Sequence, residues 1–148
     1  MRMGTAILVV DDDRAILKSF EEILKSEGYD VDTAETGLEA IQRSRKKYYN
    51  IALLDIKLPD MEGTELLTKL HEDIPRMIKI MITGHASLEN AVRALNLGAD
   101  AYLMKPVNPE ELLRVIADKL REQAEAEEMG QEQARRWIQS RIRKLQSR

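Results

Sequence analysis

Residues 51–63 read IALLDIKLPDMEG, and the interpretation of the whole chain starts from them. The first four are apolar without interruption, a pattern typical of a strand that is buried on both faces in the middle of a parallel sheet. Pro59 ends this strand, so that Asp55 falls at its carboxyl end. Ligands of open α/β sheets bind along that edge. An aspartate there can also do no more than open a turn, and the rest of the chain decides between these two interpretations.

Composition places the chain among ordinary globular proteins. It has 148 residues, of which 43% are hydrophobic and 33% charged, as is usual for one domain with a short additional segment. No apolar run approaches the ~20 residues of a membrane helix. The sequence has no cysteine, which excludes disulfides, thiol catalysis and cysteine metal sites and favours a cytoplasmic location.

Five short apolar runs alternate with five helical patterns along the chain. This alternation predicts a doubly wound α/β domain, with a parallel sheet between two layers of helices. The expected strands are residues 6–10, 30–34, 51–54, 78–82 and 101–104. The first expected helix carries its apolar face over residues 16–24 and closes near Gly28, and Thr36 or Gly37 opens the second, whose apolar residues run to 41. The others are residues 64–70 and 86–97, and a last helix that begins at Pro109. The polar run at 30–34 is expected at an edge of the sheet, and Lys79 argues against complete burial of the fourth strand.

The last helix has no stop signal at the end of the domain. Its apolar residues keep helical spacing as far as Leu120, and residues 121–132 are then highly polar, with Gly130 as a possible break that costs about 1 kcal/mol relative to alanine. An apolar stripe then resumes, made up of Trp137, Ile138, Ile142 and Leu145. Residues 1–120 carry a net charge of −5 and residues 121–148 one of +2. We therefore divide the chain into a domain, residues 1–120, and a helical extension, residues 121–148.

Polar side chains suited to chemistry follow four of the five expected strands. They are Asp11, Asp12 and Asp13 after the first, Asp55 after the third, Thr83 after the fourth and Lys105 after the fifth. In a parallel sheet the carboxyl ends of the strands share one edge, so these side chains are expected to converge on one cleft. Clustered carboxylates without histidine or cysteine favour a hard cation such as Mg2+.

Such a cleft would be suited to phosphoryl transfer. A bound cation allows like charges to lie together without raising a pKa, and an ionised Asp55 can then accept a phosphoryl group covalently. Lys105 and the cation would neutralise the charge of the phosphoryl group, and Thr83 would donate a hydrogen bond to one of its oxygens. The combination therefore favours Asp55 as a nucleophile over Asp55 as a turn residue.

The same residues give the chain a family resemblance over about residues 5–120. It resembles the receiver domains of two-component response regulators, and it is similar to the chemotaxis regulator and to the receivers that precede bacterial enhancer-binding activators. The resemblance rests on residues 9–13 (VVDDD), then Asp55, Leu58, Pro59, Met61 and Gly63, Thr83 and Gly84, Gly98 and Ala99, and Tyr102, Lys105 and Pro106. It implies a flavodoxin-like (βα)5 sheet in the strand order 2-1-3-4-5. It also implies a phosphoacceptor signalling protein rather than an enzyme, one that promotes its own phosphorylation and dephosphorylation.

The resemblance implies a role for each carboxylate of the cleft. Asp55 matches the phosphoacceptor, which receives its phosphoryl group from a sensor histidine kinase or a phosphotransfer protein. Asp12 and Asp55 match direct ligands of Mg2+, together with the backbone carbonyl of Lys57. Asp11 matches a ligand that acts through water.

Three further residues match the family's signalling machinery. Lys105 resembles the phosphate-binding lysine, and by resemblance its bond to Pro106 is cis. Thr83 and Tyr102 match a switch pair, in which the hydroxyl moves toward the phosphoryl group and leaves space for the aromatic ring to turn inward. Tyr102 can alternatively be a half-buried aromatic residue of an edge strand.

Two residues beside the cleft have simpler interpretations. Asp13 is expected to cap the first helix. His85 occupies a position that in this family can tune the lifetime of the phosphoryl group, but a lone histidine is more often merely solvated.

The sequence leaves the output open. By resemblance, the face formed by the fourth helix, the fifth strand and the fifth helix binds a downstream protein target or a second copy. The extension can form a coiled coil through Ile138, Ile142 and Leu145, although fewer than two heptads is short, or the chain can be a receiver fragment of a longer transcriptional regulator. Binding of nucleic acid is disfavoured because a basic helix is more often solvated, and no membrane partner is expected.

Two other classes of protein fit the residues less well. An aspartyl-phosphate phosphohydrolase usually carries a second aspartate two residues after its nucleophile, where this chain has Lys57. A flavin-binding domain of similar topology needs a phosphate-binding loop after the first strand, where Asp11, Asp12 and Asp13 would repel a phosphate.

Overall fold

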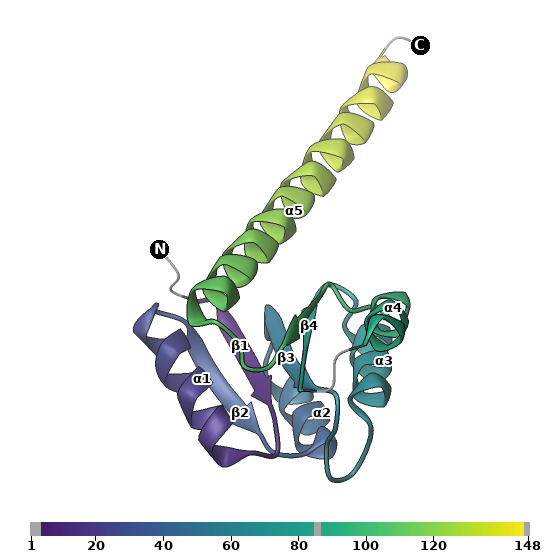
Figure 1. The fold of residues 1–148 in the computed structure, drawn as a ribbon. Helices are drawn as coiled ribbons and strands as arrows, with labels where there is room; N and C mark the ends of the chain where they lie inside the picture. The colour runs from purple at the N-terminus through teal and green to yellow at the C-terminus, as the bar shows by residue number, and fades with distance from the viewer. Residues whose placement is uncertain (1–3, 85–86, 147–148) are drawn as a thin grey trace.

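A computed structural model gives the fold of residues 4–84 and 87–146. Its strands form one parallel sheet in the order β2-β1-β3-β4-β5 (Figure 1). The strands are β1 (Ala6–Val10), β2 (Asp30–Ala34), β3 (Ile51–Asp55), β4 (Ile78–Thr83) and β5 (Ala101–Met104). The order confirms the doubly wound, flavodoxin-like sheet, and the polar strand β2 lies at an edge as predicted.

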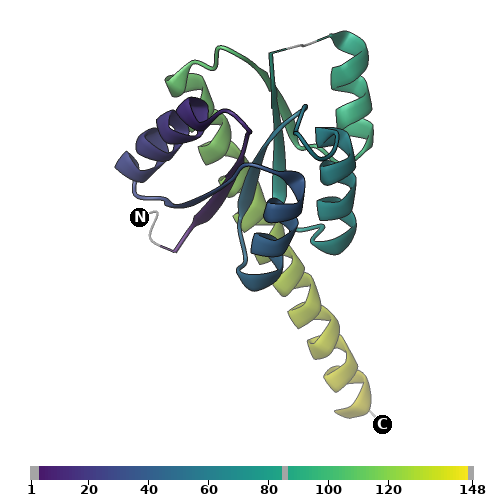
Figure 2. The ribbon, with the colours of Figure 1, turned by 90° about the horizontal axis from the view of Figure 1, so that it is seen from below.

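Helices cover both faces of this sheet (Figures 1 and 2). They are α1 (Arg14–Ser26), α2 (Gly37–Lys46), α3 (Gly63–Asp73), α4 (Leu88–Asn96) and α5 (Pro109–Gln146). Leu24 of α1 and Ile116 of α5 are buried in one hydrophobic cluster. Ala40 of α2, Leu67 of α3 and Ala94 of α4 belong to the cluster on the opposite face. Within the described ranges, no helix is both long enough and apolar enough to cross a bilayer.

The strand β3 is buried on both faces, as its apolar run predicted. Ala52 and Leu54 pack into the cluster beneath α2, α3 and α4, whereas Ile51 and Leu53 pack into the cluster beneath α1 and α5. Each large apolar side chain buried in this way stabilises the fold by roughly 1.5–3 kcal/mol. Because β3 pairs with β1 on one side and β4 on the other, Asp55 leaves the sheet between the ends of those two strands.

Lys79 corrects one expectation from the sequence. Its side chain is only 1% exposed, so β4 is buried along its whole length. The Lys79 Nζ atom lies 3.1 Å from Nδ1 of His71, and its backbone N–H donates to Oδ2 of Asp100 at 2.8 Å. Burial lowers the pKa of Lys79, and the charge of Asp100 only partly offsets this effect. Partners that are distant in sequence therefore make the burial of this lysine possible.

Three helices differ from the predictions, and the first of them, α3, is longer at both ends than the predicted residues 64–70. The helix α4 begins at Leu88 because the side chain of Ser87 caps it by accepting a hydrogen bond from Asn90 N at 3.1 Å. The predicted start, Ala86, lies outside the described residues. The helix α5 continues through Gly130 to Gln146 without a break, and its last turns project beyond the domain in both views (Figures 1 and 2).

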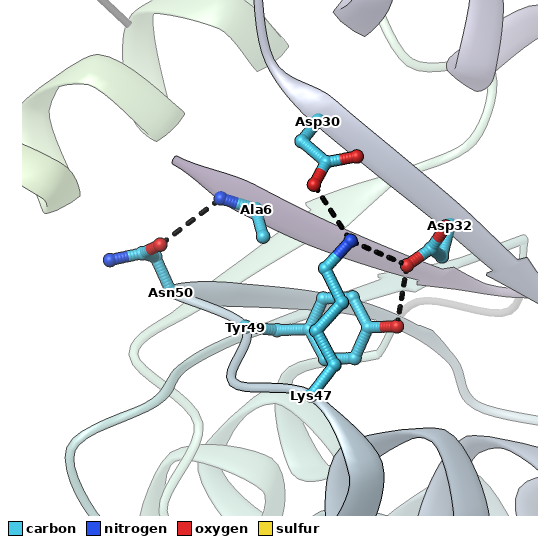
Figure 3. Close-up of polar contacts among 6 residues, drawn as sticks. All are labelled: Ala6, Asp30, Asp32, Lys47, Tyr49 and Asn50. Carbon is cyan, nitrogen blue, oxygen red and sulfur yellow. Dashed lines mark hydrogen bonds and ion pairs between the residues drawn. The ribbon is translucent and has the colours of Figure 1, made fainter. Parts of the chain in front are cut away.

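The amino edge of the sheet is closed by a network of polar contacts that the sequence analysis missed (Figure 3). The Nζ atom of Lys47 donates to Oδ2 of Asp30 at 2.7 Å and to Oδ2 of Asp32 at 3.0 Å. The Tyr49 hydroxyl donates to the same Asp32 oxygen at 2.7 Å. Beside them, Oδ1 of Asn50 accepts from the backbone N–H of Ala6 at 3.1 Å. These contacts connect β1 and β2 to the segment between α2 and β3.

Candidate functional site

Three carboxylates meet at the opposite, carboxyl edge of the sheet. Asp11 and Asp12 follow β1, and Asp55 ends the neighbouring strand β3. One carboxylate oxygen from each of the three lies within 4.8 Å of the other two. Asp11 is 3% exposed and Asp55 9%, while Asp12 is exposed to solvent. Two of the three negative charges are thus largely removed from water at the bottom of a site that Asp12 leaves open.

Lys105 brings a positive charge into this cluster. Its Nζ atom lies 2.8 Å from Oδ2 of Asp11 and 3.5 Å from Oδ2 of Asp55. The backbone fixes its position, because its N–H donates to the carbonyl of Thr83 at 2.8 Å and its bond to Pro106 is cis. The cis bond is the isomer that the resemblance implied. Asp11, Asp55 and Lys105, which lie far apart in the sequence, therefore come together at the carboxyl edge of the sheet.

The charges of the site are not balanced. Burial raises the pKa of Asp55, the charge of Asp11 raises it further, and Lys105 offsets only part of the rise. Burial lowers the pKa of Lys105, but its hydrogen bond to Asp11 and the charges of both carboxylates outweigh burial, so the net shift is upward. One ammonium group therefore faces three carboxylates. Such a set of hard oxygen donors with excess negative charge has the chemistry of a site for Mg2+ or a similar divalent cation.

Asp13 points away from this cluster. Its carboxylate accepts a hydrogen bond from Ala15 N at 2.9 Å and caps α1, which agrees with the sequence prediction. The backbone N–H of Asp13 donates to Oδ1 of Asp11 at 2.9 Å. Asp11 thus receives this hydrogen bond on one oxygen and Lys105 on the other, which fixes its orientation.

Gly63 and Asp60 hold the segment after β3 in place. A Cβ atom at Gly63 would lie 2.1 Å from the backbone oxygen of Asp55, so a larger residue would displace the chain at the site. The two carboxylate oxygens of Asp60 accept hydrogen bonds from the N–H groups of Gly37 and Leu38, both at 2.9 Å, at the beginning of α2. The sequence indicates Gly63 only through its spacing in the family pattern, and it predicts no role for Asp60. The closeness of Asp60 to Pro59 was the available signal, because aspartate beside proline is typical of structured turns.

The remaining predicted residues lie around the cluster. Thr83 is fully buried at the end of β4. The ring of Tyr102 packs against the cluster beneath α2, α3 and α4, and burial raises the pKa of its hydroxyl. Lys57 is exposed and forms an isolated antiparallel bridge with Glu62. His85 lies outside the described residues.

Comparison with known proteins gives a consistent family. A family model described as the response regulator receiver domain matches residues 7–117. The cell cycle response regulator CtrA of Brucella ovis is 40% identical over 110 residues, which cover 74% of this chain and 47% of that protein. The chain therefore spans about half the length of the curated relatives that it matches.

Solved structures agree with this result. A CheY-like response regulator receiver domain protein from Methanospirillum hungatei JF-1 is 57% identical, with a TM-score of 0.80 over 82% of this chain and 98% of that one. The beryllofluoride-activated NtrC4 receiver domain dimer is 36% identical, with a TM-score of 0.77 over 80% of this chain and 98% of that one. NtrX from Brucella abortus is 30% identical, with a TM-score of 0.80, and the match covers 84% of this chain and 29% of that protein.

Proposed function

This chain belongs to the response regulator receiver family of two-component signalling, and from this premise we propose that Asp55 is its phosphoacceptor. One observation carries the assignment: a nearly buried carboxylate at the end of the central strand has a lysine Nζ 3.5 Å away and two further carboxylates beside it. Burial and the charge of Asp11 keep this group poorly neutralised. New positive charge in the site, such as that of a divalent cation, would stabilise a carboxylate in such a state.

The transfer proposed here is a group exchange. One oxygen of Asp55 forms a bond to phosphorus while the bond between phosphorus and a histidine nitrogen of the partner breaks. The partner is a sensor histidine kinase or a phosphotransfer protein. Lys105 would pair with a phosphoryl oxygen, and its contact with Asp11 keeps the ammonium group directed at this space before the phosphoryl group arrives. Thr83 would donate a hydrogen bond to another phosphoryl oxygen.

Three carboxylates and one carbonyl would hold the cation that the reaction requires. We assign Asp11, Asp12, Asp55 and the backbone carbonyl of Lys57 to Mg2+. When bound, this ion would neutralise charge on the phosphoryl oxygens and on the clustered carboxylates. The short distances between the carboxylate oxygens of Asp11, Asp12 and Asp55 support the assignment, because without a cation like charges this close raise a pKa.

The proposed output is a change of protein contacts. Thr83 and Tyr102 would act as a switch pair that alters the face made by α4, β5 and α5, which then binds a downstream target or a second copy in the cytoplasm. The inward packing of the Tyr102 ring supports this role. Residues 1–120 would be the receiver, and residues 121–148 would form a helical extension. A second arrangement is a receiver module within a longer transcriptional regulator, which the greater length of the CtrA relatives favours.

The phosphoacceptor is tested by mass. The full chain is incubated with acetyl phosphate and Mg2+, and its intact mass is measured over time. We expect one added phosphoryl group in the native chain and none in Asp55→Asn. Asp13→Asn is the matched control, because Asp13 is the nearby carboxylate that caps α1 instead of facing the cluster, and this variant should be labelled like the native chain. Persistent labelling of Asp55→Asn would overturn the assignment.

The switch is tested separately from the transfer. Thr83→Ala should still accept the phosphoryl group, but it should lose the change in Tyr102 fluorescence or amide chemical shifts that beryllofluoride and Mg2+ produce in the native chain. A full response in Thr83→Ala would remove the threonine from the switch and leave the phosphoacceptor untouched.

A further inference from the structure

The segment that follows β3 is a small closed loop, residues 56–63, which we call the acceptor loop. At its base the N–H of Gly63 donates to the carbonyl of Ile56 at 2.7 Å. Across its tip the N–H of Leu58 donates to the carbonyl of Met61 at 3.2 Å. The base is thus joined directly to the end of the central strand, whereas the position of the tip depends on what the tip contacts.

The tip of the acceptor loop is attached to the beginning of α2. Both carboxylate oxygens of Asp60 accept hydrogen bonds there, one from the N–H of Gly37 and the other from the N–H of Leu38, each at 2.9 Å. A negative charge is favoured at the N-terminus of a helix, and the hydrogen bonds from Leu38 and Gly37 lower the pKa of Asp60. The Met61 side chain lies against Gly37, where an added Cβ atom would overlap it. The two polar contacts are directional, so they set the orientation of the tip.

The beginning of α2 is itself fixed to the acidic site. The N–H of Asp11 donates to the carbonyl of Ala34, the last residue of β2, at 3.1 Å. The helix α2 begins only three residues after Ala34, and the side chain of Thr36 caps it. Asp60 therefore joins the acceptor loop to a part of the backbone whose position relative to Asp11 is set by a hydrogen bond.

We propose that Asp60 is a positioning residue, which orders the tip of the acceptor loop and thereby holds the backbone carbonyl of Lys57 in place for the divalent cation. This inference rests on the cation site of the proposed function. Asp60 acts through the loop, because the N–H groups of α2 occupy both of its carboxylate oxygens. Of the proposed ligands, the Lys57 carbonyl alone belongs to the backbone, so no side-chain rotation can correct its position. Groups that orient a metal ligand in this way contribute to the affinity for the metal.

The effect on the cation is measured as the dissociation constant of Mg2+ for the full chain, without a phosphoryl donor, from amide chemical shifts. Asp60→Ala should raise this constant about three- to tenfold, because the Lys57 carbonyl would be less well ordered. Asp60 is exposed, so water can replace part of its contact with α2. Asp60→Asn keeps one carbonyl oxygen as an acceptor and should give a constant between those of the native chain and Asp60→Ala.

Thr36→Ala is the matched control. The Thr36 hydroxyl accepts from the N–H of Glu39 at 3.1 Å, so this variant also removes a side-chain acceptor at the beginning of α2 and should destabilise the helix comparably. That hydrogen bond stays within α2, and the dissociation constant of Mg2+ should therefore remain close to the native one. A native constant in Asp60→Ala, or equal increases in the two variants, would reduce Asp60 to a helix cap and overturn the proposal.

The order of the loop is measured separately by amide hydrogen exchange without Mg2+. Asp60→Ala should speed exchange at Leu58, whose hydrogen bond spans the tip, and leave exchange at Gly63 in the base nearly native. Unchanged exchange at Leu58 would contradict the ordering role. A native chain that binds no Mg2+ would overturn this proposal together with the cation site on which it rests, whereas Mg2+ binding that is insensitive to Asp60 would overturn this proposal alone.

Discussion

The two edges of the sheet each hold aspartates and a lysine, but they use them in opposite ways. At the amino edge, Lys47 contacts Asp30 and Asp32 at 2.7 and 3.0 Å, and Tyr49 adds a hydrogen bond to Asp32. That hydrogen bond is the main cause of the lowered pKa of Asp32, and Lys47 lowers the pKa further against the effect of burial. In turn, burial and the hydrogen bond to Asp32 raise the pKa of Tyr49 to about 12.

At the carboxyl edge, the single positive charge of Lys105 does not neutralise the three carboxylates. Lys105 is closer to Asp11 than to Asp55, Asp12 adds a third carboxylate, and burial raises the pKa of Asp55. The comparison teaches that the ratio of carboxylates to donors, together with burial, distinguishes the structural ion cluster at the amino edge from the proposed phosphoacceptor site. Residue type alone does not separate them. Four measurements can break or sharpen this contrast.

The largest contrast is expected between the two lysines. Lys105→Ala should slow labelling of the chain by acetyl phosphate about 10- to 100-fold, because a hydrogen bond to a charged group contributes about 1.5–3 kcal/mol. Lys47→Ala should be labelled at nearly the native rate. The measurement is the rate of mass increase at saturating Mg2+. Equal slowing by the two substitutions would mean that the edges are not functionally distinct.

Mg2+ should stabilise only through the carboxyl edge. At about ten to a hundred times its dissociation constant, a ligand that binds the folded state stabilises it by about 1.4–2.7 kcal/mol. We expect this increment, measured by urea unfolding with and without Mg2+, in the native chain and in Asp32→Asn. Asp12→Asn should lose most of it. A full increment in Asp12→Asn would place the cation elsewhere.

The buried Tyr49 and the partly buried Tyr102 should respond differently to loss of their hydroxyls. Tyr49→Phe should lower the free energy of unfolding by about 1 kcal/mol, because it removes the donor to Asp32. The Tyr102 hydroxyl lies near the backbone of Ser87 but outside good hydrogen-bond geometry, so Tyr102→Phe should cost less than Tyr49→Phe without a phosphoryl donor. Urea unfolding at pH 7 compares them, and a larger loss in Tyr102→Phe would reverse the assignment.

The smallest expected effect is that the stability contributed by Asp55 and the stability contributed by Asp32 change in opposite directions with pH. The pKa of Asp55 is raised on folding, so the stability that it contributes is full below the unfolded value of 3.8 and is lost as pH rises through the folded value. The pKa of Asp32 is lowered, so its contribution is full above 3.8 and is lost as pH falls through the folded value.

Without Mg2+, raising the pH from about 3 to 7 should therefore stabilise Asp55→Asn relative to the native chain and destabilise Asp32→Asn relative to it. Urea unfolding across this range provides the measurement. Changes of the same sign in both variants would contradict the contrast between the edges.

The architecture of the sheet was predictable because its signals are local. The apolar run of residues 51–54, the polar residues at strand ends and the capping aspartate Asp13 are each recognised from a few neighbouring residues. Alternation of strands and helices then brought Asp55 and Lys105 to one edge by topology alone. Strand order came only from the family resemblance, because right-handed crossovers allow several orders.

Features that depend on distant partners were missed. Lys79 looked too polar for a buried strand, and only the approach of His71 and Asp100 from other elements explains its burial. The cluster around Lys47 and Tyr49 was missed for the same reason, since Asp32 lies on a strand that precedes both in the chain. The spacing of residues along the sequence does not show which side chains of different strands and helices will be in contact.

The unbroken course of α5 has a mechanical consequence. Beyond Leu120 the helix continues for about 26 residues, or about 40 Å at 1.5 Å per residue. A rotation of about 5° where the helix leaves the sheet would move its far end by about 3.5 Å. A shift too small to rearrange the core would thus be magnified into a displacement comparable to the size of a side chain, and the helix would act as a lever.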